Sequence, residues 1–560
     1  MMNEDMRRVP DGTDFTQEPP EQEPQRQSYF LAKARGHVRR ESERLGRPLT
    51  YAVITFGCQM NARDSEKLAG VLTQAGYQRK EEEDADFVIL NTCTVRDNAN
   101  QRVYGKLGVL NGLKRRNPHR KVALCGCMMQ EQAVIDRIRE SYRFVDLIFG
   151  TYNLFKFAEL LVTVFENSVP EPREKGFHPA AGRFPRMVID VWKAAGENFR
   201  RETGISGEEA AFPIPENLPA ERKYSFKSGV NIMYGCNNFC SYCIVPYVRG
   251  RERSREVRDI LEEIRQLVRD GAVEVMLLGQ NVNSYGKNLE PPVTFARLLE
   301  EIEKIEGLKR IRFMTSHPKD LSDELIEVMK HSRKICRHFH LPLQSGSTRV
   351  LQAMNRCYTK ERFIELALRI RRELPDVSLT TDIIVGFPGE TPEDVDETIE
   401  VVRTVKFENA FTFRYSKRTG TPAAAMEQVP EETAKKGFEK LLKAVQATAK
   451  EQAARFQGQI EEVLVEEARK QEENGAETEG RSVSLGCGAF LLTGRLSNNL
   501  LVHFPWNEEN VSPPVGEIVP VRLDECRGFY YLGTLADTRV PDRQLKSPDR
   551  QPKSPDRQLK

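Results

Sequence analysis

The chain has 560 residues and a mass of 64.0 kDa, which excludes a single small module and allows several domains of roughly 100–200 residues each. Lys plus Arg total 84 against 82 for Asp plus Glu, so the formal charge is +2 and any nucleic-acid partner must be met by local basic patches. No run of about 18 apolar residues and no apolar secretory signal are present, so we expect a cytoplasmic protein without a membrane span. In that reducing compartment, the 11 cysteines are expected to be ligands or core thiols rather than disulfides.

A polar leader and a parallel-sheet domain come first in chain order. Residues 1–47 are rich in Pro, Glu and Gln before a basic stretch that can form one surface helix, and we expect this leader to be disordered. From Tyr51, short apolar runs alternate with helical periodicity, which predicts βα units and a parallel sheet over residues 48–164. The predicted strands are YAVITF, DFVILN, KVALC and VDLIFG.

A second βα series follows a break in the pattern. Residues 165–226 carry many prolines, glycines and charges, which favours a linker or an insertion. Over residues 227–455 the predicted strands are VNIMY, VEVMLL, RIRFM, HFHLPL, SLTTDIIV and AFTFRY. Six successive units fit a partial (β/α)6 barrel better than a complete eight-fold one.

The last part of the chain changes to short strand-like runs separated by turn residues. This texture predicts a small β-barrel over residues 456–537, so the overall fold class is α/β with an all-β C-terminal domain. Residues 538–560 then repeat a seven-residue unit as VPDRQLK, SPDRQPK and SPDRQLK. A proline in every unit forbids a continuous helix, and we expect a disordered basic tail.

The segment GCNNFCSYC carries the strongest local signal. Cys236, Cys240 and Cys243 follow an apolar strand directly, and a tight loop can aim all three thiolates at one centre. Three ligands leave one coordination position open, and soft thiolates suit iron–sulfur chemistry. The alternative is a zinc knuckle completed by a distant His or a fourth cysteine. It is disfavoured because the loop lies at the C-terminal end of a barrel strand, where active sites collect.

This CxxxCxxC loop, with an aromatic at Tyr242, resembles the signature of radical S-adenosylmethionine enzymes. The resemblance implies that the three thiolates hold a 4Fe-4S cluster whose fourth iron is chelated by S-adenosylmethionine. Upstream, TFGCQMN, NTCTVR and GCMMQ resemble the N-terminal domain of the methylthiotransferases, and the likeness runs from about Thr50 to Leu535.

The upstream cysteines, Cys58, Cys93 and Cys127, each lie just past a predicted parallel strand. The carboxyl ends of such strands meet at one edge of a sheet, so these thiolates are expected to hold a second 4Fe-4S cluster. Cys125 lies inside a predicted strand, and we interpret it as a core thiol. Ligand spacing is lacking around the four remaining cysteines, which are Cys336, Cys357, Cys487 and Cys526.

Polar residues at the ends of the other barrel strands fall where the resemblance places bound S-adenosylmethionine. The contacts carried over from the family are Tyr242, Gln280, Asn281, Gln344 and Asp382. Gly386 and Gly389 allow the backbone to approach the nucleoside, although a plain turn explains them about as well. We interpret His317 and His340 as hydrogen-bonded structure, and we expect no catalytic residue beyond the cluster ligands.

Basic residues concentrate in two places that border the proposed sites. Residues 98–130 contain 7 Lys/Arg and no Asp or Glu, and five arginines follow the radical cluster loop, namely Arg249, Arg251, Arg253, Arg255 and Arg258. Each patch either contacts RNA phosphates or is a solvated helix face. The C-terminal β region resembles the TRAM domain, yet residues 455–537 carry 7 Lys/Arg against 14 Asp/Glu. Candidates for a local RNA-binding face are Arg481, Arg495, His503 and Tyr530.

Three further stretches narrow the resemblance within the methylthiotransferases. VPYVRGRERSR, LLGQNVNSYG and YSKRTGTPAA are most similar to the enzymes that methylthiolate carbon 2 of N6-dimethylallyladenosine at tRNA position 37. The resemblance implies that one S-adenosylmethionine methylates sulfur at the Cys58/Cys93/Cys127 cluster. A second is cleaved at the other cluster, and the resulting 5′-deoxyadenosyl radical removes the hydrogen of carbon 2.

Other functions remain open at this point. The paralogues act on threonylcarbamoyladenosine in tRNA or on a ribosomal-protein aspartate, and a non-enzymatic zinc and RNA-binding protein is the alternative from another class. The expected partners are the anticodon stem-loop of tRNA and an electron donor such as a flavodoxin or ferredoxin. We expect a monomer.

Overall fold

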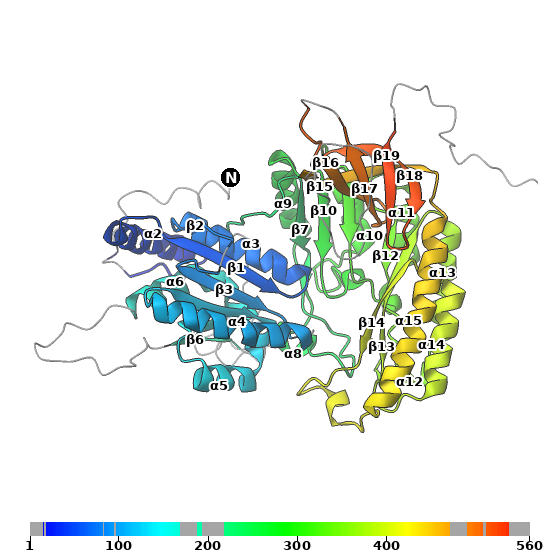
Figure 1. The fold of residues 1–560 in the computed structure, drawn as a ribbon, viewed down its shortest axis with the longest axis horizontal. Helices are drawn as coiled ribbons and strands as arrows, with labels where there is room; N and C mark the ends of the chain where they lie inside the picture. The colour runs from blue at the N-terminus through cyan, green and yellow to red at the C-terminus, as the bar shows by residue number, and fades with distance from the viewer. Residues whose placement is uncertain are drawn as a thin grey trace, which may run out of the picture. The chain divides into compact units, whose positions relative to one another are not determined.

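The structure, a computed structural model, describes residues 15, 18–81, 83–94, 97–167, 187–192, 218–470, 490–507 and 511–536. The predicted tail over residues 538–560 lies outside the described residues, as do Arg481 and Cys487. The chain divides into two compact units, Met1–Ala449 and Lys450–Lys560 (Figure 1). Within the described ranges, every helix is too short or too polar to cross a membrane.

A parallel sheet begins the first unit, and six of its strands lie in the described ranges (Figure 1). In spatial order they are β2 (Gln78–Arg79), β1 (Thr50–Phe56), β3 (Phe87–Thr92), β4 (Lys121–Gly126), β5 (Leu147–Phe149) and β6 (Val188–Asp190). The four predicted strands of this domain are confirmed as β1, β3, β4 and β5. The two strands that the sequence did not indicate, β2 and β6, lie at the edges of the sheet.

Helices cover both faces of this sheet. One face packs against α2, α3 and α6 around Ile89, and the other packs against α4 and α5 around Val88. All six residues of β3 are buried, as expected for a parallel strand covered on both sides. The helical elements are α2 (Gln25–Leu45), α3 (Gln59–Gln74), α4 (Asp97–Arg116), η1 (Cys127–Gln130), α5 (Gln132–Ser141), η2 (Thr151–Lys156) and α6 (Phe157–Glu166).

Helix α2 corrects the assignment of residues 1–47 to a disordered leader. It is a helix of 21 residues whose Phe30, Leu31, Ala34 and Val38 are buried in the same core as α6. Arg26 also pairs with Glu159 of α6 at 2.7 Å. The basic stretch forms the one helix expected there, but the expected disorder is wrong for residues 25–45, because a narrow apolar stripe is enough to bury a helix whose overall composition is polar.

The range 165–226, predicted to be a linker or insertion, supplies one strand of the sheet. Val188 and Ile189 of β6 pair in parallel with Leu147 and Ile148 of β5. Trp192 follows this strand and packs edge-on against Phe155, with ring centroids 5.7 Å apart. Within this range, β6 is therefore an edge strand of the N-terminal sheet rather than part of a linker.

The second half of the first unit confirms the partial barrel, with six parallel strands in the described ranges. They form two three-stranded sheets, ordered β11-β10-β7 and β12-β13-β14, and a parallel bridge joins Ile311 to Ile335. These strands are β7 (Lys227–Asn231), β10 (Glu274–Leu278), β11 (Arg310–Phe313), β12 (His338–His340), β13 (Ser378–Val385) and β14 (Asn409–Arg414). A short antiparallel pair, β8 (Met233–Tyr234) and β9 (Arg253–Ser254), lies beyond β7.

Amphipathic helices cover the outside of the barrel and share one apolar core with its strands. The helical elements of this domain are α8 (Val245–Arg249), α9 (Val257–Arg269), η3 (Val282–Ser284), α10 (Phe295–Glu303), η4 (Pro318–Asp320), α11 (Asp323–His331), α12 (Thr348–Ala353), α13 (Lys360–Glu373), α14 (Pro392–Val405), η5 (Pro422–Ala425) and α15 (Glu431–Ala454). This layering places the loops that follow each strand at one end of the barrel, where radical-cluster and nucleoside contacts were predicted.

The second unit is the predicted small β-barrel. Its strands close in the order β15 (Ile460–Lys470), β16 (Phe490–Leu496), β17 (Leu501–Trp506), β19 (Tyr530–Leu535) and β18 (Ile518–Cys526). Alternate residues such as Val463, Phe504 and Tyr531 fill the interior. The barrel fits the TRAM-like domain that the resemblance implies.

Candidate functional site

The three upstream cysteines lie together at the carboxyl edge of the N-terminal sheet. Cys58 is the N-cap of α3, Cys93 follows β3 directly, and Cys127 opens η1 after β4. A hydrogen bond with Cys93 lowers the pKa of Cys58 to about 5 against the opposing effect of burial. Burial raises the pKa of Cys127, and the nearby Cys58 thiolate raises it further.

Close backbone packing fixes this edge. Gly126 has a φ of +98°, and a Cβ there would collide with the carbonyl oxygen of Thr92. Asn61, fully buried on α3, donates from Nδ2 to Asn91 Oδ1 and to the Thr92 carbonyl, both at 3.0 Å. These contacts hold the segments that carry the three cysteines at fixed spacing.

The neighbouring thiol Cys125 belongs to the core, as predicted. It is 1% exposed and packs in the apolar cluster on the α2, α3 and α6 side of the sheet. Burial raises its pKa well above the usual value of a thiol. Cys125 is therefore a core residue and not a cluster ligand, although Cys127 lies only two residues further along the chain.

The second cysteine triad lies in the loop between β8 and α8. Gly235 precedes it with a φ of +76°, and a Cβ there would collide with the carbonyl of Arg251. Cys236 N donates to the Gly250 carbonyl at 3.0 Å, and Cys243 N donates to the Cys240 carbonyl at 2.9 Å. The loop thus folds back on itself around the three thiols.

Burial and repulsion between neighbouring thiolates raise the pKa values in this triad. Burial raises the pKa of Cys236 to about 11 and that of Cys243 to about 12, and the Cys240 thiolate raises both. Each thiol therefore lies within electrostatic reach of the others. Bound iron would stabilise the thiolates that burial disfavours, because a coordinating thiol is deprotonated.

The donor chemistry of both triads fits iron–sulfur clusters better than a single ion. Among the described residues, no group of three or more His, Cys, Asp or Glu side chains is arranged to hold a metal ion. All six positions are thiols, the ligand type that holds Fe–S clusters.

The predicted S-adenosylmethionine contacts surround the barrel mouth, but several already have protein partners. Gln344 N donates to the Asp382 carbonyl at 2.8 Å, so these two residues lie side by side. Asn281 Nδ2 donates to Asp320 Oδ2 at 2.8 Å, and Gln280 Nε2 lies 2.7 Å from the sulfur of Met60 on α3. Gln280 therefore reaches from the barrel to the edge that carries Cys58.

Two further observations concern this mouth. Tyr242, within the cysteine loop, packs against an apolar cluster of Val350, Met354, Phe387 and Ala423. The Ser316 hydroxyl, at the end of β11, is buried and has no hydrogen-bond partner in the described part of the chain. An unsatisfied hydroxyl at the barrel mouth fits a polar group of a bound nucleoside.

The two histidines near the mouth are hydrogen-bonded structure. His317 Nδ1 accepts from Lys319 N at 3.2 Å, and burial lowers the pKa of His317 to about 2. His340 contacts Thr380 Oγ1 at 3.0 Å and Asp382 Oδ2 at 3.2 Å. His317 therefore stays neutral at physiological pH.

The two basic patches are less exposed than the sequence suggests. In the first, Lys114 is buried and pairs with Asp146, while Arg115 and Arg116 are exposed. Lys114 is therefore not available to phosphates, because its charge is already matched inside the domain.

The second patch is divided in the same way. Arg249 and Arg255 are 5% and 4% exposed, whereas Arg251 and Arg258 are exposed. Arg255 pairs with Glu263 at 2.6 Å, and Arg249 lies against Cys127. Arg249 and Arg255 are therefore not available to phosphates.

In the C-terminal barrel, the described candidates for an RNA face make internal contacts. Arg495 Nη1 donates to the Asn499 carbonyl at 3.0 Å, and its Nε lies 3.4 Å from Glu466. His503 and Tyr530 pack edge to face, with ring centroids 5.0 Å apart. These three side chains lie on neighbouring strands β16, β17 and β19.

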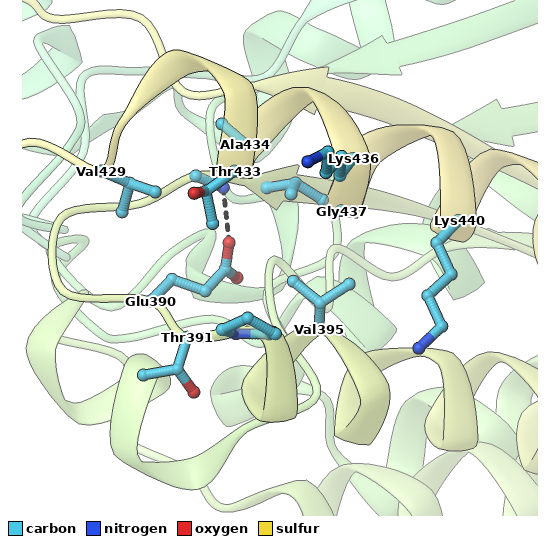
Figure 2. A pocket seen from close by; sticks show the side chains of 12 residues that line it. Glu390, Thr391, Val395, Val429, Thr433, Ala434, Lys436, Gly437 and Lys440 are labelled. Atoms are coloured by element: carbon cyan, nitrogen blue, oxygen red, sulfur yellow. Dashed lines mark hydrogen bonds between the residues drawn. The ribbon is translucent and has the colours of Figure 1, made fainter.

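A pocket of about 280 Å³ lies between the end of β13, α14 and α15 (Figure 2). Its walls include Val385, Val395 and Ala434, and Glu390 accepts a hydrogen bond from Gly386 N at 2.5 Å. Burial raises the pKa of Glu390 to about 7. Gly386, a candidate for close approach to the nucleoside, lines this pocket, whereas none of the predicted cluster ligands or S-adenosylmethionine-binding side chains in the described ranges does.

Two family models match parts of the first unit. Residues 230–402 match the family model of the Radical SAM superfamily, and residues 50–150 match that of Uncharacterized protein family UPF0004. The barrel and its cysteine loop thus define a radical SAM domain. The radical S-adenosylmethionine methyltransferase TsrM from Kitasatospora setae is similar at a TM-score of 0.45 and 16% identity, over 67% of this chain and 74% of that chain.

Curated relatives match almost the whole chain. A tRNA-2-methylthio-N(6)-dimethylallyladenosine synthase from Lachnoclostridium phytofermentans is 54% identical over 508 residues, which is 90% of this chain and 100% of that protein. A protein of the same name from Acetivibrio thermocellus is 46% identical over 512 residues, which is 91% of this chain and 96% of that protein. The chain belongs to the tRNA-2-methylthio-N(6)-dimethylallyladenosine synthase family. Its radical SAM domain implies a 4Fe-4S cluster and S-adenosylmethionine as cofactors.

Proposed function

We propose that this protein methylthiolates carbon 2 of N6-dimethylallyladenosine at position 37 of tRNA, using two 4Fe-4S clusters. One cluster is held by Cys58, Cys93 and Cys127, and the other by Cys236, Cys240 and Cys243. The observation that carries the proposal is the pair of cysteine triads, one at the carboxyl ends of the parallel strands β1, β3 and β4 and the other in the loop after β8, on domains that touch through Gln280 and Met60. The identity to relatives with that name supports the substrate.

The residues around the two triads supply orientation and shelter from water. When bound, the clusters and S-adenosylmethionine provide the methylthio group and the radical that removes the hydrogen of carbon 2. Gln344 and Asp382, side by side at the barrel mouth, are proposed to bind the polar groups of S-adenosylmethionine. Carbon 2 offers no acidic proton, which agrees with a neutral, hydrogen-bonded His317 beside the site.

The proposed tRNA contacts use the exposed cations. Arg115 and Arg116 of α4 and Arg251 after the cysteine loop are exposed, so they can meet phosphates without breaking an internal pair. Reduction of the radical cluster requires an electron donor, and we propose a flavodoxin or a ferredoxin.

Nucleoside mass spectrometry of tRNA tests the substrate. A deletion strain should lack 2-methylthio-N6-dimethylallyladenosine, and the intact gene should restore it. Loss of the methylthio mark from threonylcarbamoyladenosine instead would select the paralogous activity. An unchanged nucleoside profile, with zinc and no sulfide in the purified protein, would support the zinc and RNA-binding alternative.

Cluster counting after anaerobic reconstitution tests the ligands. The parent protein should bind two 4Fe-4S clusters, and Cys93→Ala should bind one while still cleaving S-adenosylmethionine reductively. Cys125→Ala is the matched control, because Cys125 is also 1% exposed and lies on the adjacent strand. It should keep both clusters. Finding one cluster in the parent protein would contradict the proposal.

A further inference from the structure

Arg249 belongs to the barrel domain, yet its side chain lies at the cysteine triad of the N-terminal sheet. It ends helix α8 and follows the radical-loop residue Cys243 by six positions. Its Nε donates to Cys127 Sγ at 3.1 Å, and the side chain is 5% exposed. Burying a cation costs free energy unless the cation is paired, so the buried guanidinium of Arg249 needs negatively charged partners.

The rest of the guanidinium reaches the other side of the same triad. Nη2 lies 3.4 Å from both Asn61 Oδ1 and Asp64 Oδ2. Asn61 Oδ1 also accepts from the Cys58 thiol at 3.2 Å. One planar group therefore contacts Cys127 directly and Cys58 through a shared amide, which suits the fixed fork of arginine better than a lysine.

The segment that carries Arg249 also holds the radical loop. The Gly250 carbonyl accepts from Cys236 N at 3.0 Å, one residue beyond the arginine. On the other side, the Val248 carbonyl accepts from Thr151 Oγ1 of η2 at 3.1 Å, and Val248 packs against Cys127. Residues 244–250 thus form a strap that touches both cysteine triads.

The ionisable groups that surround the Arg249 guanidinium are Cys127, Asp64 and Cys58. Cys127 and Asp64 lie within hydrogen-bonding distance of its guanidinium, and Asn61 links that guanidinium to Cys58. An arginine side chain is not deprotonated in proteins, so it stays charged whatever the state of the thiols. Hydrogen bonds to cluster sulfurs and the net charge around them set the reduction potential of an Fe–S cluster.

We propose that Arg249 is a positioning residue of the cluster held by Cys58, Cys93 and Cys127, supplied in cis by the barrel domain. Its guanidinium fixes the Cys127 sulfur and raises the reduction potential of that cluster by adding a positive charge. The N-terminal cysteine site is therefore complete only when the strap of residues 244–250 is in place. This role rests on the proposed function, because it requires a second cluster.

The test isolates the cluster held by Cys58, Cys93 and Cys127 in the full-length chain. Cys236, Cys240 and Cys243 are replaced by Ala, the protein is reconstituted anaerobically with iron and sulfide, and the midpoint potential is measured by EPR-monitored titration. On this background, Arg249→Gln should shift the potential to more negative values, and Asp64→Asn should shift it to more positive values. Arg249→Lys, which keeps the charge, should stay closer to the background value.

Arg255→Gln is the matched control. Arg255 is 4% exposed and lies on the same chain segment, but it pairs with Glu263 at 2.6 Å. Its variant should leave the potential unchanged. Equal shifts in Arg249→Gln and Arg255→Gln, or no shift in Arg249→Gln, would overturn the proposal.

Iron content separates the remaining outcomes. If Arg249→Gln binds no cluster, retention of iron by Arg249→Lys supports the role of the charge, and equal loss in both variants overturns it. Cluster counting in the parent chain, which has all six cysteines, distinguishes a failure of the proposed function from a failure of the role of Arg249. A single cluster there contradicts the proposed function, whereas two clusters with an unshifted potential contradict only the role of Arg249.

Discussion

Arg356 donates from Nη1 to the sulfur of Cys240 at 3.6 Å, so the radical loop also lies against a buried arginine. The same guanidinium donates to the Pro342 carbonyl at 2.7 Å and to the Tyr358 hydroxyl at 3.0 Å. Burial opposes its charge, but Tyr358, Tyr242 and Cys240 raise the pKa of Arg356 above its ordinary value. This cation ties the cysteine loop to the segment that follows β12.

Replacing Arg356 by Gln should destabilise the fold and loosen the radical loop. The buried acceptors that it serves would lose a donor, at a cost of about 1–3 kcal/mol. Chemical denaturation and iron content per chain measure the two effects. Arg362→Gln is the control, since Arg362 is 68% exposed and pairs with Glu365 on the surface of α13. It should change stability by less than about 0.5 kcal/mol; equal effects of the two variants would contradict a specific role for Arg356.

Replacing Gly126 by Ala should damage the N-terminal cysteine edge. The residue has a φ of +98°, and its added methyl group would meet the Thr92 carbonyl, so we expect a loss of about 1–3 kcal/mol. Iron bound by the Cys58/Cys93/Cys127 triad should fall with it, because Cys127 is the next residue.

Gly105→Ala is the control for that change. Gly105 lies within α4 and has no atom within 4 Å of its Cβ position, so alanine should stabilise the helix by up to about 1 kcal/mol. Thermal unfolding followed by circular dichroism compares the two variants. Similar shifts for both would argue against the close approach at Gly126.

Replacing Glu390 by Gln should make the protein more stable in a way that grows with pH. The folded pKa is raised to about 7 by burial, whereas the unfolded carboxyl titrates near its ordinary value of 4.5. As pH rises from about 4.5 to about 7, the unfolded chain releases a proton that the folded chain keeps, and stability falls. Glutamine removes this loss and can still accept from Gly386 N.

The stability difference should therefore be small near pH 4.5 and reach on the order of 3 kcal/mol above pH 7. Unfolding midpoints across this pH range measure it. Glu427→Gln serves as the control, because Glu427 is exposed. A difference between Glu390→Gln and the parent that does not vary with pH would count against the buried carboxyl.

Neutralising Arg115 and Arg116 together should weaken tRNA binding without harming the fold. Both side chains are exposed on α4, so each variant removes only a potential phosphate contact. The slope of log affinity against log salt should become shallower by about 1 per lost contact. Filter binding at several salt concentrations measures this slope. Lys114→Gln should instead lower stability, since Lys114 pairs with Asp146 inside the domain; an unchanged slope in the double variant would exclude α4 from the tRNA interface.

Much of the cysteine arrangement could be predicted because it follows from strand periodicity. The apolar runs that became β1, β3 and β4 are unbroken, and parallel strands must end at a common edge. The positions of Cys58, Cys93 and Cys127 at that edge therefore follow from their positions along the chain. Cys125 could be assigned to the core for the same reason, since it lies within β4.

The arginines show where such reasoning stops. Arg249 and Arg251 are two residues apart in one basic run, but the first is buried against Cys127 and the second is exposed. Charge alone does not distinguish them, because burial depends on contacts between domains far apart in sequence. The burial of α2 escaped prediction for a related reason, as Leu31 and Ala34 lie in a polar stretch and are buried in a core that residues of α3 and α6 share.

The late strand β6 determines how the N-terminal domain can be cut from the chain. A fragment ending at residue 164 would leave the backbone of Leu147 and Ile148 without the partner strand that Val188 and Ile189 provide. It would also uncover Phe155, which Trp192 covers in the intact protein. Exposed strand edges favour association between chains. A fragment made for expression or crystallisation therefore needs to extend through Trp192 to keep the partner strand of β5 and the cover over Phe155.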